Sequence, residues 1–379
     1  MVSDNRSYSA ARLKRLRAEM DKRGIAAYLM RNTSDIAWAT AFDAVFDEEQ
    51  AHALLVDAEH AWLHTDSRYA LACRQAAGDG PIQVEDERVS HAVWAARHLA
   101  REPYAAPTGS SWLAVEDALT VREYRALKDA CEQAGLGEPF RFLSEFGTSL
   151  RAVKDDFEVA RCRSAQEITD AAFAYIVSFM KAGMTERQVQ LALDAKMREL
   201  GSDGLSFPTI VATGAHAASA HAQPGDTVIA EGDAIVMDFG AKKDGYCSDM
   251  TRTVFAGQPD EQVRRAYACL RRINEEVEAW LAPGRSAKEA HEMAERMLAE
   301  DGFGGAMGHS LGHGVGIDIH ELPVLSPRTD AVLEPGNIVT VEPGIYLPGR
   351  FGMRLEDFGV ISACGFSVLT QSPHDMVII

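Results

Sequence analysis

Four acidic residues and one histidine, all of types that bind divalent cations, follow one another through the C-terminal half of this chain. They are Asp238, Asp249, His313, Glu342 and Glu356. Asp238 ends the apolar run Ala-Ile-Val-Met, and Glu342 ends the run Ile-Val-Thr-Val. Because a buried carboxylate without a partner is strongly destabilising, we expect these side chains to face one interior site that holds cations.

The kinds of ligand atom indicate which metals such a site would bind. Carboxylate oxygen and imidazole nitrogen suit manganese, cobalt, iron and zinc, and the set needs no cysteine. Two Asp, two Glu and one His are enough to hold two cations. A cation pair lowers the pKa of a shared water and makes hydroxide available near neutral pH, so the pattern predicts a hydrolase.

Two strand-like segments would position the first two carboxylates. Residues 236–240 and 248–253 are separated by the turn-forming residues 243–245, with the sequence Lys-Asp-Gly. A hairpin of these strands would bring Asp238 and Asp249 to one place. We therefore expect one hairpin to supply two of the five ligands.

The order of helical and strand-like segments divides the chain into two domains. Its 379 residues exceed the usual size of a single domain. Helices and strands alternate at first, which predicts an α/β N-terminal domain of residues 1–148. A long helical pattern then begins, and a capping-box spacing from Thr185 to Gln188 opens another helix. We place the second domain at residues 149–379.

Composition excludes some classes of binding partner and indicates the cellular compartment. The formal net charge of -18 and the pI of about 5.1 oppose binding to nucleic acid or to anionic membrane surfaces. Six cysteines are scattered without Cys-x-x-Cys pairs, which indicates reduced thiols. The N-terminus lacks the apolar core of a signal peptide, and no stretch reaches membrane-spanning length. We expect a cytoplasmic protein.

Two longer phrases carry a resemblance to a known family. One is Gly308-His309-Ser-Leu-Gly-His313-Gly-Val-Gly-Ile-Asp-Ile-His320-Glu321, and the other is Thr65-Asp66-Ser67-Arg68-Tyr69. With the ligand order Asp, Asp, His, Glu, Glu, they resemble the pita-bread metallopeptidases of family M24, especially the Xaa-Pro branch that has a creatinase-type N-terminal domain. The resemblance implies an α+β pita-bread catalytic domain after the α/β N-terminal domain.

The resemblance implies a role for each ligand. Asp238 would chelate one cation, Asp249 and Glu356 would bridge both, and His313 and Glu342 would complete the other. Glu342 would also accept the proton of the attacking water. Manganese is the expected metal, with cobalt, zinc or iron as alternatives.

Further residues would contact the substrate, again by resemblance. His320 would bond the scissile carbonyl and shuttle protons, and His221 would lie near the leaving nitrogen. His309 would line a proline pocket, next to Tyr346 and Arg354. His216 does not fall on a matching position, so we expect it to be exposed to solvent.

Arg354 and Glu356 are two positions apart, so in one strand they would face the same side. Arg354 would then support the metal-binding carboxylates.

The expected activity is hydrolysis of the Xaa-Pro bond at the N-terminus of peptides, as by aminopeptidase P. Three alternatives remain: a dipeptidase of the prolidase type, an amidohydrolase of the same fold acting on a non-peptide C–N bond, and a non-catalytic scaffold. A scaffold would be expected to have lost ligands, and this chain retains all five. Family members form dimers or larger assemblies, so we expect a homodimer or a higher homo-oligomer.

Overall fold

The protein consists of two compact units. The computed structural model describes residues 5–47, 49–101 and 112–379. By their internal contacts the units are Met1–Arg151 and Ala152–Ile379. The boundary between functional domains that the sequence indicates, between residues 148 and 149, stays a prediction.

The first unit is built on one mixed sheet with the strand order β4-β3-β2-β1-β5-β6. Strands β1, β2 and β3 pair in antiparallel fashion, whereas β3–β4, β1–β5 and β5–β6 are parallel. The elements of this unit are α1 (Asn5–Lys22), β1 (Ala27–Met30), α2 (Thr33–Thr40), β2 (His52–Asp57), β3 (Ala61–Thr65), α3 (Ala70–Ala77), β4 (Gln83–Glu85), α4 (His91–Arg101), β5 (Leu113–Glu116), α5 (Val121–Gln133), β6 (Phe140–Leu143) and α6 (Phe146–Arg151).

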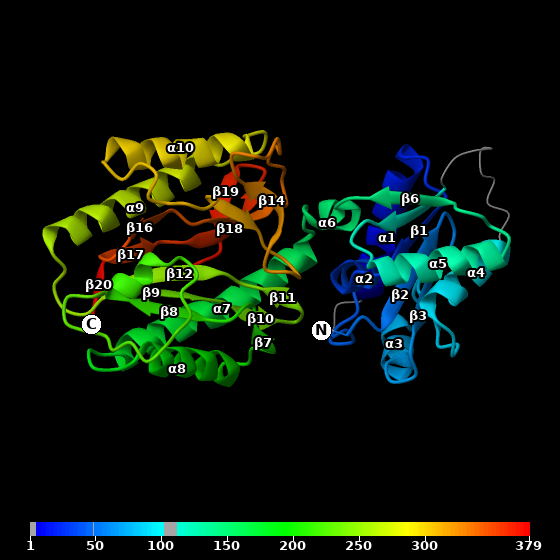
Figure 1. The fold of residues 1–379 in the computed structure, drawn as a ribbon, viewed down its shortest axis with the longest axis horizontal. Coiled ribbons are helices and arrows are strands. Elements are labelled where there is room, and N and C mark those ends of the chain that lie inside the picture. The colour runs from blue at the N-terminus through cyan, green and yellow to red at the C-terminus, as the bar shows by residue number, and fades with distance from the viewer. Residues whose placement is uncertain (1–4, 48, 102–111) are drawn as a thin grey trace. The chain divides into compact units, whose positions relative to one another are not determined.

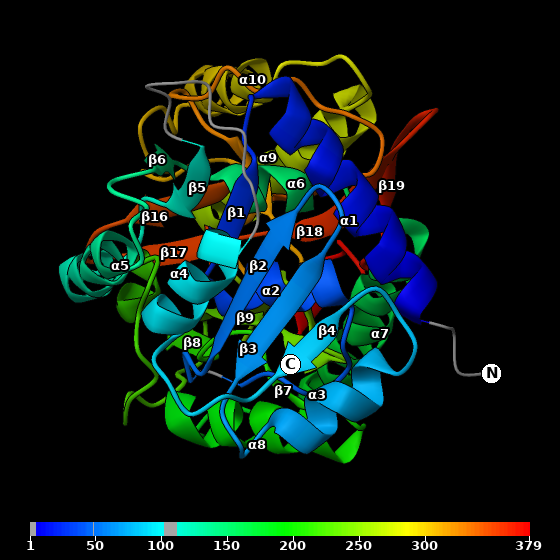
Figure 2. The ribbon, with the colours of Figure 1, turned by 90° about the vertical axis from the view of Figure 1, so that its right-hand side faces the viewer.

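Helices cover both faces of this sheet. Trp94 and Leu99 of α4 and Leu127 of α5 pack in one apolar core with Leu29 and Leu55 of the central strands. Figure 2 shows α1 on one side of the sheet and α4 and α5 on the other. The alternation of helix and strand, with both sheet faces covered, is the α/β arrangement that the sequence predicts.

Glu116, at the end of β5, is a buried carboxylate that links the stability of the first unit to pH. Its side chain accepts hydrogen bonds from the backbone nitrogens of Arg31 and Asn32, each at 3.0 Å. Burial, reinforced by the nearby Asp35, raises the pKa of Glu116 to about 7 from 4.5. Because the pKa of Glu116 is higher in the folded than in the unfolded state, protonation of this side chain stabilises the fold. This contribution to stability is fully present below pH 4.5 and is lost as the pH rises through about 7.

Glu116→Gln should therefore be more stable than the unchanged protein by a margin that grows with pH. We expect the margin in unfolding free energy to increase by about 3 kcal/mol between the unfolded and folded pKa values. Urea unfolding followed by tryptophan fluorescence measures it, because four of the five tryptophans lie in this unit. A margin that does not change with pH would contradict the assignment.

The second unit carries the five expected ligands. Its larger sheets have the strand orders β20-β12-β9-β8 and β14-β13-β15-β18-β19. Its elements are α7 (Asp156–Phe179), α8 (Glu186–Glu199), β7 (Gly204–Leu205), β8 (Ile210–Thr213), the 3-10 helix η1 (Gly214–Ala218), β9 (Ala234–Phe239), β10 (Ala241–Lys243), β11 (Tyr246–Cys247), β12 (Met250–Phe255), α9 (Glu261–Trp280), α10 (Ala287–Glu300), β13 (Gly312–Gly314), β14 (Glu321–Leu325), β15 (Ile338–Val341), β16 (Gly344–Leu347), β17 (Phe351–Arg354), β18 (Asp357–Ser362), β19 (Gly365–Val368) and β20 (Val377–Ile378).

Two helix pairs enclose these strands. Helices α7 and α8 share an apolar core with β8, β9 and β12, and helices α9 and α10 share another with β15, β16 and β17. Figure 1 shows the strands between the two pairs. The predicted capping box is confirmed: the side chain of Thr185 accepts from the nitrogen of Gln188, and the side chain of Gln188 accepts from the nitrogen of Thr185.

The structure differs in one respect from the hairpin that the sequence predicts. Strands β9 and β12 are antiparallel neighbours, but the turn at residues 243–245 closes the smaller hairpin of β10 and β11. That hairpin belongs to a separate sheet with β7. The chain changes sheet at Gly240, where a Cβ atom would lie 2.0 Å from the carbonyl oxygen of Ser248. Asp249 consequently lies in the link between β11 and β12.

Candidate metal centre

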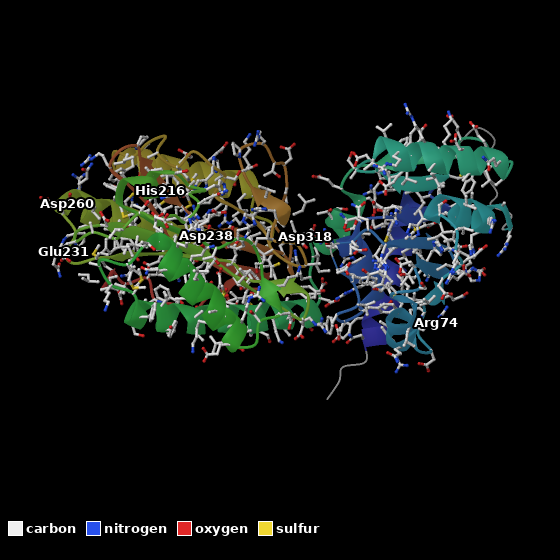
Figure 3. The ribbon with its side chains drawn as sticks, turned by 60° about the horizontal axis from the view of Figure 1, so that its bottom comes forward. Arg74, His216, Glu231, Asp238, Asp260 and Asp318 are labelled. Carbon is white, nitrogen blue, oxygen red and sulfur yellow. The ribbon has the colours of Figure 1, made fainter. Side chains whose placement is uncertain are left out.

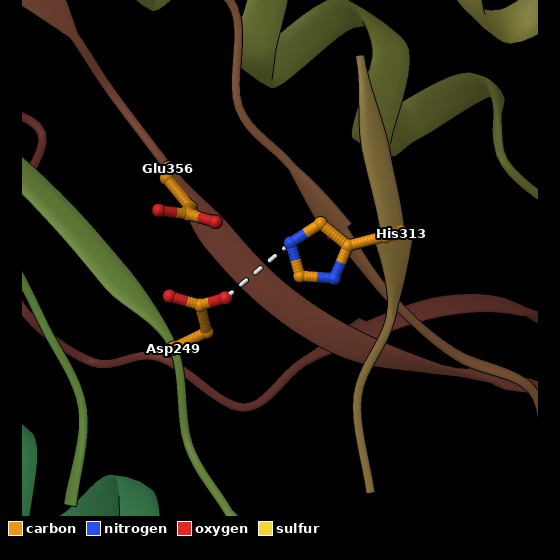
Figure 4. Close-up of side chains that lie close together, drawn as sticks. All are labelled: Asp249, His313 and Glu356. Atoms are coloured by element: carbon orange, nitrogen blue, oxygen red, sulfur yellow. Dashed lines mark ion pairs between the residues drawn. The ribbon is translucent and has the colours of Figure 1, made fainter. Parts of the chain in front are cut away.

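Three of the expected ligands converge from distant parts of the chain. Asp249 precedes β12, His313 lies in β13, and Glu356 lies between β17 and β18. Each offers one ligand atom, and these atoms all lie within 4.8 Å of one another. Figure 4 shows the two carboxylates and the imidazole directed toward a common space. At this spacing the three side chains could hold a divalent cation.

The other two expected ligands lie close to these three. Glu342 follows β15, and its Oε1 lies 3.5 Å from Nε2 of His313. The pairing of Val341 with Asp357 places Glu342 next to Glu356. Asp238 pairs across the sheet with Thr251. The structure therefore brings all five residues into one region.

Strand alternation explains why these carboxylates face inward. Met237 and Phe239 pack in the core beneath α7 and α8, so Asp238 between them points the opposite way. Val341 packs in the core beneath α9 and α10, so Glu342 after it points away from those helices. Asp238 is 8% exposed, and Figure 3 labels it within the second unit. The apolar runs thus fix the directions of both acids.

Buried carboxylates at this spacing disfavour their own ionisation. Burial raises the pKa of Asp249 well above its usual range, and the charge of Glu356 raises it further. The pKa of Glu356 is raised in the same way, first by burial and then by Glu342. Burial also raises the pKa of Glu342 to about 8. A cation among these groups would remove the repulsion.

The remaining donor atoms also fit metal binding. Oδ1 of Asp238 is buried and has no hydrogen-bond partner among the described residues. Nδ1 of His313 lies 3.0 Å from the carbonyl oxygen of Gly314, so its proton is donated there and Nε2 is left with a lone pair. Burial lowers the pKa of His313 to about 4, which keeps the imidazole neutral. Oxygen and neutral imidazole ligands suit a pair of divalent cations.

Two threonines next to the ligands are absent from the sequence prediction. Oγ1 of Thr251 donates to Oε2 of Glu356 at 2.6 Å, and Oγ1 of Thr340 donates to Oε1 of Glu342 at 3.3 Å. Each lies two positions from a ligand in its own segment, Asp249 or Glu342. Side chains two positions apart share one face of a strand, which is the signal that could have identified them.

Arg354 connects the carboxylates to the expected substrate-binding residues. Its guanidinium donates to Oδ2 of Asp238, to Oγ1 of Thr251 at 2.9 Å and to the hydroxyl of Tyr346 at 2.6 Å. The Tyr346 hydroxyl lies 3.1 Å from Nε2 of His309. Nδ1 of His309 donates to the carbonyl oxygen of Ser310 at 2.8 Å, so Tyr346 donates to Nε2.

The prediction that Arg354 and Glu356 share one strand is wrong, although they share a side. β17 ends at Arg354 and β18 begins at Asp357, because the chain passes there from a two-stranded sheet to a five-stranded one. Met353 and Leu355 still pack in the core beneath α9 and α10. The alternation therefore continues through the link, and both polar side chains reach Thr251.

The two expected catalytic histidines are exposed beside the buried ligands. The ring of His320 makes an edge contact with the ring of His313, with centroids 4.4 Å apart. His221 follows η1. It lies near enough to Asp238 and His320 for its charge, when protonated, to favour the ionised carboxylate and the neutral imidazole. Because these two imidazoles are exposed to solvent, they can contact a bound substrate from the side of the acidic cluster that faces solvent.

His216 differs from the expectation. It is only partly exposed, because its Nδ1 lies 2.8 Å from Oε1 of Glu186, a fully buried carboxylate. The same carboxylate accepts from the backbone nitrogens of Thr213 and Gly225 at 2.9 and 3.0 Å. His216 thus helps to hold the loop that carries His221.

Comparison with known proteins identifies the family. The profile of metallopeptidase family M24 matches residues 160–363, and the profile of the creatinase/prolidase N-terminal domain matches residues 12–153. The chain belongs to metallopeptidase family M24. Membership confirms the predicted pita-bread catalytic domain and the prediction that the protein is an enzyme.

Similar proteins include one uncharacterized peptidase and two solved structures whose names refer to the Xaa-Pro or X-Pro bond. An uncharacterized peptidase of Bacillus subtilis is 41% identical over 237 residues, which cover 62% of this chain and 67% of the relative. The structure of a Xaa-Pro dipeptidase from Bacillus anthracis has a TM-score of 0.89 at 33% identity and covers 98% of this chain and 100% of its own. An X-Pro aminopeptidase from Thermotoga maritima MSB8 has a TM-score of 0.82 at 31% identity, covering 95% and 100%.

Replacing Thr251 by valine tests the newly found hydroxyl in this M24 enzyme. Valine keeps the shape but removes the donor to Glu356, so we expect kcat/KM to fall about 10- to 100-fold. Steady-state peptide hydrolysis at saturating metal measures the effect. Thr209→Val is the matched control, because Thr209 donates to Asp194 at 2.6 Å outside the cluster. Equal losses in the two variants would contradict the role of Thr251.

Proposed function

We propose that the protein hydrolyses the peptide bond between an N-terminal residue and a proline in the second position, as an aminopeptidase P does. The observation that carries the proposal is the convergence of five candidate ligands, three of them buried, beside two exposed histidines, His221 and His320. The names of the similar solved structures support the choice of a bond next to proline.

Each ligand has a role in this proposal. Asp238 would bind one cation, Asp249 and Glu356 would be shared between two, and His313 and Glu342 would complete the second site. When bound, the cations, which we propose to be manganese, supply an activated water and polarise the scissile carbonyl. Glu342 accepts the proton of the attacking water. Burial raises the pKa of Glu342 to about 8, so its ionised form is a stronger base than an ordinary carboxylate.

The histidines and Tyr346 handle the substrate. His320 donates a hydrogen bond to the carbonyl oxygen of the bond that is cleaved, and His221 delivers a proton toward the leaving proline nitrogen. His309 and Tyr346 line the pocket for the proline ring. Since burial lowers the pKa of His309 to about 4, its ring stays neutral and suits an apolar substrate group. A bond before proline is a tertiary amide without an N–H, so recognition depends on such a pocket.

Arg354 favours an aminopeptidase over a dipeptidase. A dipeptidase must bind the free carboxylate of its proline, for which a guanidinium is the usual partner. The guanidinium of Arg354 is instead engaged by Asp238, Thr251 and Tyr346. Dipeptidase activity is the second candidate, because the similar structure from Bacillus anthracis is named a Xaa-Pro dipeptidase.

Two proline peptides distinguish these candidates. The purified enzyme with manganese is given Ala-Pro and Ala-Pro-Ala, and release of free alanine is followed. We expect the tripeptide to be the better substrate and Ala-Ala-Ala to stay intact. Faster cleavage of Ala-Pro would instead establish the dipeptidase.

Compartment and assembly complete the proposal. We propose a cytoplasmic homodimer, or a larger homo-oligomer, that binds neither nucleic acid nor membranes. All six cysteines are free, as expected for a reducing compartment. In the described part of the chain, no helix has both the length and the apolar character needed to cross a bilayer.

A further inference from the structure

We propose that Lys154 is a positioning residue, which acts through Glu321 to hold His320 in place for catalysis. Nζ of Lys154 lies 2.9 Å from Oε2 of Glu321, and the two side chains are 0% and 1% exposed. The inference rests on the proposed function, because it concerns the histidine assigned to the scissile carbonyl. The pair lies outside the set of candidate ligands, and neither member takes part in the proposed mechanism.

The backbone of Lys154 is anchored on the segment that leads to a ligand. Its nitrogen donates to the carbonyl oxygen of Gly336 at 2.8 Å. The side-chain nitrogen of Asn337 donates to the carbonyl oxygen of Ala152 at 3.0 Å. Gly336 and Asn337 immediately precede β15, which ends next to Glu342. These two hydrogen bonds fix the backbone from which the ammonium group of Lys154 extends.

Glu321 shapes the loop that carries His320. Its Oε1 accepts from the backbone nitrogen of Asp318 at 3.0 Å. A Cβ atom on Gly316 would lie 2.6 Å from its Oε2, so the loop wraps closely around the carboxylate. The carbonyl oxygen of Gly316 accepts in turn from the nitrogen of Cys247 at 2.8 Å. The loop at residues 315–320 is thus tied to a single buried acid.

His320 and Glu321 are neighbours at the start of β14, so their side chains point to opposite sides. Glu321 faces the buried lysine, and His320 faces the ring of His313 at 4.4 Å between centroids. An ion pair at this depth adds little net stability compared with apolar residues of the same size. Its directional contacts, in contrast, fix where the backbone of His320 lies.

A double-mutant cycle tests the proposal. Lys154→Met should lower kcat on Ala-Pro-Ala about 10- to 100-fold, because a displacement near 1 Å is enough for that loss. In a His320→Ala background the same change should alter kcat by no more than about twofold. Lys154→Arg should restore most of the activity. The double variant Lys154→Met with Glu321→Gln, which leaves no unpaired carboxylate in the pair, should fold and show the same loss as Lys154→Met.

The control is a buried ion pair of the first unit. Nε of Arg151 lies 2.8 Å from Oδ1 of Asp35, with side chains 3% and 5% exposed. Arg151→Met should lower the thermal midpoint and leave kcat per folded molecule unchanged. An equal loss of kcat from Lys154→Met with and without His320 would overturn the proposal, because it would show a general structural effect.

Hydrogen exchange of the metal-free protein gives a readout that needs no activity. Peptides that cover residues 314–321 should exchange faster in Lys154→Met and in Glu321→Gln than in the unchanged protein, and those from β9 should not change. Unchanged exchange in the loop would overturn the proposal. If the unchanged enzyme cleaves no proline peptide, the proposed function fails, and the exchange result still decides whether the pair holds the loop.

Discussion

Asp249→Asn is expected to lower kcat/KM by about 1000-fold or more, equivalent to about 4 kcal/mol in the barrier. Oδ2 of Asp249 lies 3.6 Å from Nε2 of His313. A carboxylate oxygen of Asp249 also lies within 4.8 Å of one of Glu356. A carboxamide has no negative charge and only one oxygen atom, so it could not bind two cations as a carboxylate can. Metal content after dialysis should fall together with the activity, and elemental analysis beside steady-state kinetics measures both.

Asp260→Asn is the matched control for this variant. Asp260 caps α9 by accepting from the nitrogen of Val263 at 2.9 Å, and asparagine caps helices equally well. Figure 3 shows Asp260 at the margin of the second unit, away from Asp238. The control should keep both metal and activity. An Asp249→Asn protein that also retained its full metal content and activity would contradict the proposed role of Asp249 as a metal ligand.

Arg354→Met is expected to lower kcat/KM by about 100-fold or more, because it leaves buried carboxylates without their guanidinium partner. The side chain is 4% exposed and pairs with Asp238. Its loss would also release Tyr346 and Thr251, which it holds at 2.6 and 2.9 Å. Kinetics on Ala-Pro-Ala and thermal unfolding of the same preparations separate lost chemistry from lost folding.

Arg354→Lys should not restore the activity. Three separate oxygen atoms are bonded by different nitrogens of a planar fork, and a single ammonium group cannot reach them all. Arg271→Met is the control, since Arg271 lies on α9 with 41% of its side chain exposed and pairs with Glu275. Full activity in Arg354→Lys would show that only the charge matters and would contradict the importance of the fork.

The inward direction of two candidate ligands could be predicted because each follows an apolar run. Apolar runs that end in Asp238 and Glu342 become strands whose alternation directs the acids inward. The capping box at Thr185 is equally local, and it is confirmed. Both patterns involve residues within a few positions of each other. Their outcome depends little on what the rest of the chain does.

Contacts between distant segments could not be predicted in this way. Nothing near Lys154 in the sequence indicates that its partner is Glu321, because their meeting depends on how α7 and β14 are placed in the fold. The hydrogen bond from Thr251 to Glu356 likewise depends on the packing of β12 beside the link after β17. The hairpin of β10 and β11 could not be predicted, because the same turn would also fit a hairpin of the longer strands β9 and β12.

Titration of the metal-free enzyme with manganese, with release of alanine from Ala-Pro-Ala as the readout, tests the central claim most directly. If Asp238, Asp249, His313, Glu342 and Glu356 hold two cations that serve hydrolysis, activity is absent without metal and reaches its maximum at about two equivalents per chain. Binding of two equivalents while every proline peptide stays intact, or full activity in the metal-free enzyme, would contradict it.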